Sequence, residues 1–263
     1  MTYNFHLTPR KNPSVLRINC YLLRSYATSR TIPQKPLHKS ASKPIISSFY
    51  RGLTPLHLNG RLNAQVESDI VGYTTVTAQP GFTLMALPFN DLASDDGISI
   101  QNLVTGDIAA NSTIQYWDGT KLNVLTYRVR GGVGSWYKGT ATADKKFFPG
   151  EGFWFNSKAT EDITLTIAGR VEEDAGLAVN KNDVALIGAA VPKTLSLNDI
   201  SFTGISTGAT LQYWDGEKLN VLTYRVRGGV GGWYKGTQTA THTILPATGF
   251  WFNANSSDVT ITF

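Results

Sequence analysis

Few residues in this sequence have the types and the spacing that catalysis or metal binding requires. His242 is the only histidine beyond residue 57, and a Ser–His–Asp arrangement needs a positioned imidazole as its base. Cys20 is the only cysteine, which excludes a disulfide within the chain and argues against a cysteine-based zinc site. It lies far from any histidine cluster, so we do not expect it to act as a nucleophile.

The carboxylates fall where turns and loops are expected. A glycosidase needs two acids facing one sugar, one of them with a pKa raised by burial, whereas Asp118 and Asp215 each precede a glycine in a predicted turn. Asp95–Asp96 and Glu172–Asp174 lie in expected loops, where calcium on oxygen ligands is an alternative, although EF-hand spacing is absent. The run GGVG at 131–134 lacks the Gly-Lys-Ser/Thr ending of a phosphate loop. We therefore predict no catalytic residue, no metal and no cofactor.

Tryptophan residues are the better candidates for a binding role. Trp154 and Trp251 are flanked by phenylalanine and are predicted to be core. The other four adjoin a hairpin turn or a glycine-rich loop, where an exposed indole can stack on a sugar: Trp117, Trp136, Trp214 and Trp233.

Two identical arginine pairs complete the candidate ligand site. They are Arg128 with Arg130, and Arg225 with Arg227, all on a strand face predicted to meet water. Solvation, together with pairing with acids on a neighbouring strand, is one interpretation. Contact with an anionic polysaccharide is the other, because guanidinium binds carboxylate or sulfate through two parallel hydrogen bonds.

A repeat places these residues in two similar contexts. Residues 115–140 and 212–237 differ at two of 26 positions, Thr120/Glu217 and Ser135/Gly232. The offset of 97 also relates FWFN at 153–156 to FWFN at 250–253. We predict two tandem copies of one module, at 69–171 and 172–263. The flanking segments have diverged far more, which either a shared constraint on the hairpin or local sequence exchange explains.

Within each copy the pattern predicts short strands. The Asp-Gly turn at 118–119 joins strands at 114–117 and 122–130. In the second strand Leu125, Tyr127 and Val129 share the predicted core face, while Val124, Thr126, Arg128 and Arg130 share the other. Residues 98–104 and 195–200 fit either a strand or a short helix, and one or two helical turns are the preferred expectation. Short strands at intervals of about 10–15 residues predict an all-β fold with a small sandwich or barrel-like module per copy.

Charge separates the N-terminal quarter from the rest. The chain has 263 residues and a formal net charge of +5, with 16% charged residues. Residues 1–68 hold ten Lys/Arg and one acid, whereas residues 69–263 hold 14 basic and 18 acidic residues. The high isoelectric point is therefore no argument for nucleic-acid binding by the folded part. No run approaches 18 apolar residues, so no transmembrane segment is expected.

Three interpretations of residues 1–68 remain open. The segment fits an export signal cleaved after Ala64, a disordered basic tail or a transit-like presequence. In each case we expect it to lie outside the fold.

The motif order resembles a module of secreted bacterial proteins with the outline GFNLIALP, yWdG, pGegFW and ltvsG. The matching residues are GFTLMALP at 81–88, IQYWDG at 114–119, PGEGFW at 149–154 and LTIAG at 165–169. The second copy departs from the outline, because it has Val184 in its first strand and lacks the closing glycine. The family is functionally uncharacterised, so the resemblance implies export and a β fold but no catalytic residue.

Together these features predict a non-catalytic protein that is secreted, periplasmic or displayed at the cell surface, with a structural or adhesive role. The alternative is a carbohydrate-binding module that uses the tryptophans and arginines named above. The expected partners are polysaccharide or other cell-surface proteins.

Overall fold

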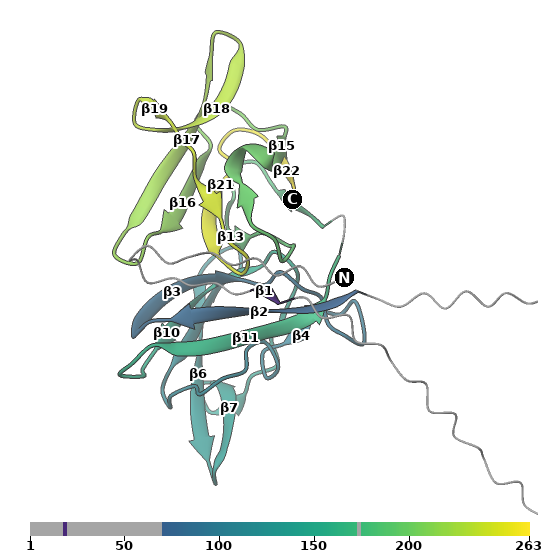
Figure 1. Ribbon diagram of the computed structural model, residues 1–263, viewed down its shortest axis with the longest axis vertical. Helices are drawn as coiled ribbons and strands as arrows, with labels where there is room; N and C mark the ends of the chain where they lie inside the picture. Colours follow the sequence, from purple (N-terminus) through teal and green to yellow (C-terminus); the bar gives the residue numbers. More distant parts are fainter. Residues whose placement is uncertain (1–17, 20–69, 173–174) are drawn as a thin grey trace, which may run out of the picture. The chain divides into compact units, whose positions relative to one another are not determined.

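Strands joined by turns make up the folded part of the chain (Figure 1). The computed structural model describes residues 18–19, 70–172 and 175–263. The predicted all-β fold is confirmed, because the only helical element among these residues is the 3-10 turn η1, Leu197–Asp199. Of the basic N-terminal segment, Ile18–Asn19 form β1, which pairs with β2. Cys20 and the predicted cleavage after Ala64 lie outside the described residues.

The strands fall into two successive series, which we call the first half (residues 70–171) and the second half (residues 172–263). The first half contains β2 (Val71–Ala78), β3 (Gly81–Ala86), β4 (Ile98–Ser99), β5 (Thr113–Trp117), β6 (Leu122–Arg130), β7 (Val133–Lys138), β8 (Ala141–Thr142), β9 (Lys146–Phe147), β10 (Gly152–Ser157) and β11 (Ile163–Arg170). The second half contains β12 (Gly176–Val179), β13 (Val184–Gly188), β14 (Leu195–Ser196), β15 (Ser201–Thr203), β16 (Thr210–Trp214), β17 (Leu219–Arg227), β18 (Val230–Lys235), β19 (Gln238–Thr239), β20 (Thr243–Ile244), β21 (Gly249–Asn253) and β22 (Val259–Thr262).

The main sheets of the two halves have the same antiparallel arrangement. Their strand orders are β3-β10-β5-β6-β7-β8 and β13-β21-β16-β17-β18-β19. Smaller sheets accompany them, with the orders β1-β2-β11 and β4-β9 in the first case and β12-β22-β15 and β14-β20 in the second. Equivalent strands pair in equivalent register, for example Tyr127 with Trp136 and Tyr224 with Trp233.

Each half buries its own core because one face of the main sheet is apolar at every second residue. In the first half, buried side chains of the main sheet pack with those of β11: Ile114, Leu125, Trp136, Phe153, Phe155, Leu165 and Ile167. The second half repeats this arrangement with β22: Leu211, Leu222, Trp233, Phe250, Phe252, Val259 and Ile261. Ala247 is the exception, because it belongs to the second half and packs into the first core.

Strands β6 and β7 form a long hairpin, the first hairpin, and β17 and β18 form the second hairpin (Figure 1). The predicted alternation is right at the base of β6, where Leu125 is buried and Val124 is exposed. It is wrong at Val129, which was expected in the core and is 51% exposed, as Val226 is at 52%. Both valines lie near the glycine turns that end the hairpins, so both faces of each hairpin tip meet solvent.

The expected helical turns near residues 98 and 195 form only in part. Ile98–Ser99 and Leu195–Ser196 are short strands that pair with β9 and β20. The 3-10 turn η1 follows in the second half, where the Ser196 hydroxyl accepts a hydrogen bond from Asn198 N. In the first half a turn follows, in which Asn102 N donates to Ser99 O at 2.8 Å. The apolar residues of this segment are held by strand pairing, which overrides their helical spacing.

Contacts between the halves occur as exchanged pairs. Ala86 N donates to Ala247 O, and Gly188 N donates to Gly150 O, both at 3.0 Å. Ala86 and Gly188 end the equivalent strands β3 and β13, while Gly150 and Ala247 are related by the 97-residue offset. Such reciprocity, in which the equivalents of two contacting residues also contact each other, is typical of two-fold symmetric association.

Candidate functional site

The tryptophans expected to stack on sugars are not exposed platforms. Trp136 and Trp233 are 1% and 3% exposed, so their indoles belong to the two cores and the prediction that they bind a ligand through exposed rings is wrong. The physical reason is strand register: Trp136 pairs with Tyr127, two residues from the buried Leu125, and therefore points to the core face.

The remaining four tryptophans join the two halves. Trp117 packs edge-to-face on Trp251 with ring centroids 5.7 Å apart, and Trp154 packs on Trp214 at 5.5 Å. All four are half-buried. The prediction that Trp154 and Trp251 lie in a core therefore needs correction, since they contact the other half. Trp117 and Trp214 were predicted as ligand-binding residues, and their rings instead pack on Trp251 and Trp154 of the other half.

The arginine pairs are placed as predicted, on the solvent face of β6 and β17. Arg130 and Arg227 are exposed, and Arg128 and Arg225 are half-buried. The Arg130 guanidinium lies 4.4 Å from the centre of the Tyr137 ring, and that of Arg128 lies 5.8 Å from the same ring. Arg227 repeats this contact on Tyr234 at 4.4 Å.

Within the described residues, none of these four guanidinium groups forms an ion pair with a carboxylate. Of the first interpretation of the arginines, pairing with acids on a neighbouring strand is therefore wrong, whereas solvation agrees with the exposure of Arg130 and Arg227. Arg227 donates one hydrogen bond, to Thr237 O at 3.4 Å. The rings of Tyr137 and Tyr234 were missed by sequence reasoning, although hairpin register places Tyr137 beside Thr126, on the face that carries Arg128.

The Asp-Gly turns at the other end of the hairpins are rigid structural features. Asp118 Oδ1 accepts hydrogen bonds from Thr120 N and Lys121 N at 2.9 Å, and Oδ2 accepts one from Asn123 Nδ2 at 2.6 Å. Asp215 accepts the equivalent backbone bonds from Glu217 and Lys218 and a 2.6 Å bond from Asn220. These donors lower the pKa of Asp215 to about 2 and that of Asp118 still further.

We expect the variant D118N/D215N to unfold at a lower temperature than the wild type at pH 6 and to show a smaller difference near pH 2. Both carboxyl groups have a folded-state pKa below the ordinary value of 3.8, so their stabilising effect is fully present above that pH and declines as the pH falls toward about 2. Thermal unfolding between pH 2 and 6 measures this. Asp162→Asn, at an exposed aspartate, is the control, and an equal difference at every pH would contradict the explanation.

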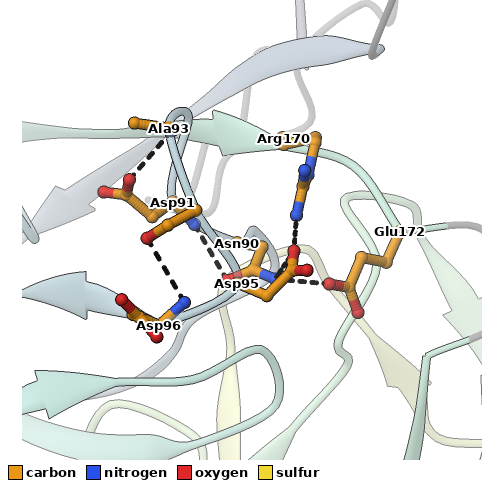
Figure 2. Close-up of polar contacts among 8 residues, drawn as sticks. Asn90, Asp91, Ala93, Asp95, Asp96, Arg170 and Glu172 are labelled. Carbon is orange, nitrogen blue, oxygen red and sulfur yellow. Dashed lines mark hydrogen bonds and ion pairs between the residues drawn. The ribbon is translucent and has the colours of Figure 1, made fainter.

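A third group of polar side chains connects the loop that follows β3 with the end of β11 and with Glu172 (Figure 2). Asn90 Nδ2 donates to Glu172 Oε1 at 2.5 Å, Arg170 pairs with Asp95, and Asp91 Oδ1 accepts from Ala93 N at 2.9 Å. These carboxylates are thus engaged with an amide, a guanidinium and a backbone donor. Among the described residues no group of three or more His, Cys, Asp or Glu side chains is arranged to hold a metal ion.

His242 stacks on Tyr213 with ring centroids 3.7 Å apart. Burial, followed by the nearby charge of Lys235, lowers the pKa of His242. The equivalent first-half pair is Lys145 and Tyr116, with the ammonium 5.3 Å from the ring centre. Since a lysine fills the same place, the shared feature of this position is packing on the tyrosine.

One pocket of about 220 Å³ lies beside the base of the first hairpin. No carboxylate or imidazole lines it, and its lining residues are Gln101, Val104, Thr105, Gly106, Ile108, Tyr127, Gly134, Ser135 and Trp136. Within the described part of the chain, no helix is long and apolar enough to cross a membrane.

Comparisons with known proteins identify no relative. The chain matches no family model, no curated protein and no solved structure. The resemblance to the secreted bacterial module therefore stays a prediction, and the two arginine-bearing hairpins are the candidate site that the geometry leaves.

Proposed function

We propose that this chain is a non-catalytic, exported protein with a structural or adhesive role at the cell surface or outside the cell, and that its two hairpins are the contact surfaces. The observation that carries the proposal is where the two halves agree in sequence. They agree on the exposed hairpin residues and differ at some buried positions outside the hairpins, although the buried phenylalanines of the FWFN segments are the same in both halves.

Particular residue pairs show this distribution. Val133 and Val230 are 68% and 71% exposed, yet both halves have valine at this position, within the same sequence RGGVG. Phe147 and Ile244 pair with β4 and β14 in the same register, are at most 1% exposed, and differ. Folding constrains buried positions more than exposed ones, so folding alone does not explain the pattern. Local sequence exchange is one explanation, and we infer the other, that each hairpin contacts the same kind of partner.

Two identical contact surfaces on one chain favour a partner that presents the same feature repeatedly. A polymer or a cell surface meets this condition, because the second hairpin then binds at the high effective concentration that the first one creates. The exposed apolar side chains near the tips enlarge the contact beyond the arginines: Val129, Val133, Val226 and Val230. Export is supported by the resemblance and by the basic N-terminal segment.

Binding to intact cells of the source organism tests the proposal. The full chain is labelled and sedimented with cells, next to variants that carry Val129→Gln and Val133→Gln in the first hairpin, Val226→Gln and Val230→Gln in the second, or all four. These positions are more than half exposed, so folding should be retained, as circular dichroism would verify.

We expect each single-hairpin variant to bind more weakly and the four-residue variant to lose binding. A fractionation of the same cells should place the native chain at the surface or in the medium. Native chain confined to the cytoplasm, or cell binding that survives in the four-residue variant, would contradict the proposal.

A further inference from the structure

We propose that the solvent face of each hairpin tip binds an acidic polysaccharide through its arginine pair. The two sites are Arg128, Arg130 and Tyr137 in the first hairpin and Arg225, Arg227 and Tyr234 in the second. This inference rests on the proposed function, in which the hairpins are contact surfaces, and adds the chemical class of the ligand.

Arginines of both hairpins lie on tyrosine rings and have no carboxylate partner among the described residues. In the first hairpin, two guanidinium groups lie within 6 Å of the centre of the Tyr137 ring, at 4.4 and 5.8 Å, and in the second, that of Arg227 lies 4.4 Å from the Tyr234 ring centre. Like charges held close together repel each other, and an anion placed between them removes that repulsion. The ring contact also holds the planar Arg130 group in place, which reduces the ordering that binding requires.

Charge is distributed unevenly over residues 69–263. Segments 115–140 and 212–237 together hold eight basic and three acidic residues, while the remainder of 69–263 holds six basic and 15 acidic residues. The cations are thus concentrated on the hairpins of an otherwise acidic body. Within residues 69–263, an anionic chain is attracted to the hairpins and repelled by the remainder, which favours contact at these two places over the rest of this region.

The number of cationic groups on each hairpin face favours a polysaccharide over a nucleic acid as the ligand. Proteins that bind nucleic acid commonly neutralise on the order of 6–10 phosphates along a continuous basic surface. Each hairpin face has two guanidinium groups, and an acidic body surrounds the pair. A polymer with one carboxylate or sulfate per sugar or per few sugars fits this sparse pattern. Hydroxyl groups on the same face can bind sugar hydroxyls, since Thr126 and Ser135 stand at neighbouring register positions.

The solvent faces of the two hairpins differ at one position, Ser135 in the first and Gly232 in the second. Ser135 pairs in register with Arg128, and its counterpart beside Arg225 is Gly232. A β-carbon on Gly232 meets only Tyr234 Cε2, at an ordinary 3.7 Å. The substitution Gly232→Ser therefore adds a hydroxyl without a clash, and we expect it to leave the affinity unchanged or to raise it by up to about threefold, the effect of a weak net hydrogen bond.

Titration calorimetry of the full chain in 150 mM salt provides the test. The probes are polygalacturonate, dextran sulfate, neutral dextran and double-stranded DNA. One variant replaces the four arginines by glutamine and a second replaces them by lysine. The matched control removes the same charge elsewhere, as Lys146→Gln, Lys158→Gln, Lys181→Gln and Lys193→Gln, all at exposed lysines. Every variant keeps the basic residues of 1–68, so their contribution cancels.

We expect the wild type to bind at least one of the two acidic polysaccharides and not dextran. The four-glutamine variant should bind that probe at least about tenfold more weakly, the loss expected for charge-assisted hydrogen bonds. The four-lysine variant should also bind more weakly, because an ammonium lacks the planar fork, and the lysine control should change by less than about twofold.

Three results would overturn the inference: equal losses in the arginine and control variants, full binding by the four-glutamine variant, or arginine-dependent binding that is tighter to DNA than to either polysaccharide. These results are independent of the valine variants. If cell binding depends on the valines but polysaccharide binding does not depend on the arginines, this inference is refuted and the proposed function is retained.

Discussion

The variant Trp136→Ala is expected to lower the free energy of unfolding by about 3–5 kcal/mol, the range for truncating a buried aromatic side chain. Trp136 is 1% exposed and packs edge-to-face against Tyr127 and Phe155 at 5.3 and 6.5 Å. Its backbone is also held, because Gln101 accepts from Trp136 N and donates to Trp136 O, both at 3.0 Å. Urea unfolding followed by circular dichroism measures the change.

Trp136→Phe is the control for this substitution, since a phenyl ring keeps part of the packing. It should lie between the wild type and Trp136→Ala in stability. A Trp136→Ala variant as stable as the wild type but defective in polysaccharide binding would show that the indole is a ligand platform after all, in conflict with its burial.

The second large effect is expected at the contact between the halves, where Gly249→Ala should destabilise the fold by about 1–3 kcal/mol, as overpacking does. A β-carbon on Gly249 would lie 2.4 Å from the carbonyl oxygen of Met85, which is backbone of the first half. Gly152, the equivalent residue, would bring its β-carbon to 2.9 Å from Ile187 N. The halves must move apart to relieve either clash, which also separates Trp117 from Trp251 and Trp154 from Trp214.

The matched control is Gly232→Ser, because the other hairpin already has serine at that position. It should unfold as the wild type does, whereas Gly249→Ala should also shift tryptophan emission to longer wavelength as the paired indoles meet water. If Gly249→Ala unfolds at the wild-type urea concentration with unchanged emission, the exchanged contacts do not hold the halves together.

The hairpins and their solvent faces could be predicted from the sequence because they depend on local signals. The Asp-Gly turns, the period of two along 122–130 and the glycine run that follows all specify one hairpin. The prediction of exposed tryptophans at 136 and 233 used proximity to glycines as its signal. Counting the register across the hairpin would have placed both rings on the core face, opposite Tyr127 and Tyr224.

Contacts between distant segments had no such local signal. The pairing of Trp117 with Trp251 joins residues in different halves, and nothing near either residue specifies the partner. The Arg130–Tyr137 contact could be anticipated in part, since alternation puts both on one face. That no carboxylate of the described residues forms an ion pair with these arginines depends on where each acidic side chain lies in the fold, and therefore required the structure.

Hydroxyl-radical footprinting of the full chain bound to intact cells tests the central claim most directly, because it maps the contact surface without assuming a ligand. The claim predicts protection on binding at residues 122–138 and 219–235, with Tyr137 and Tyr234 reporting through their reactive rings. Exposed residues away from the hairpins, such as Phe148 and Leu92, should remain as reactive as in the free protein. Protection of those residues while both hairpins stay fully reactive would contradict the claim.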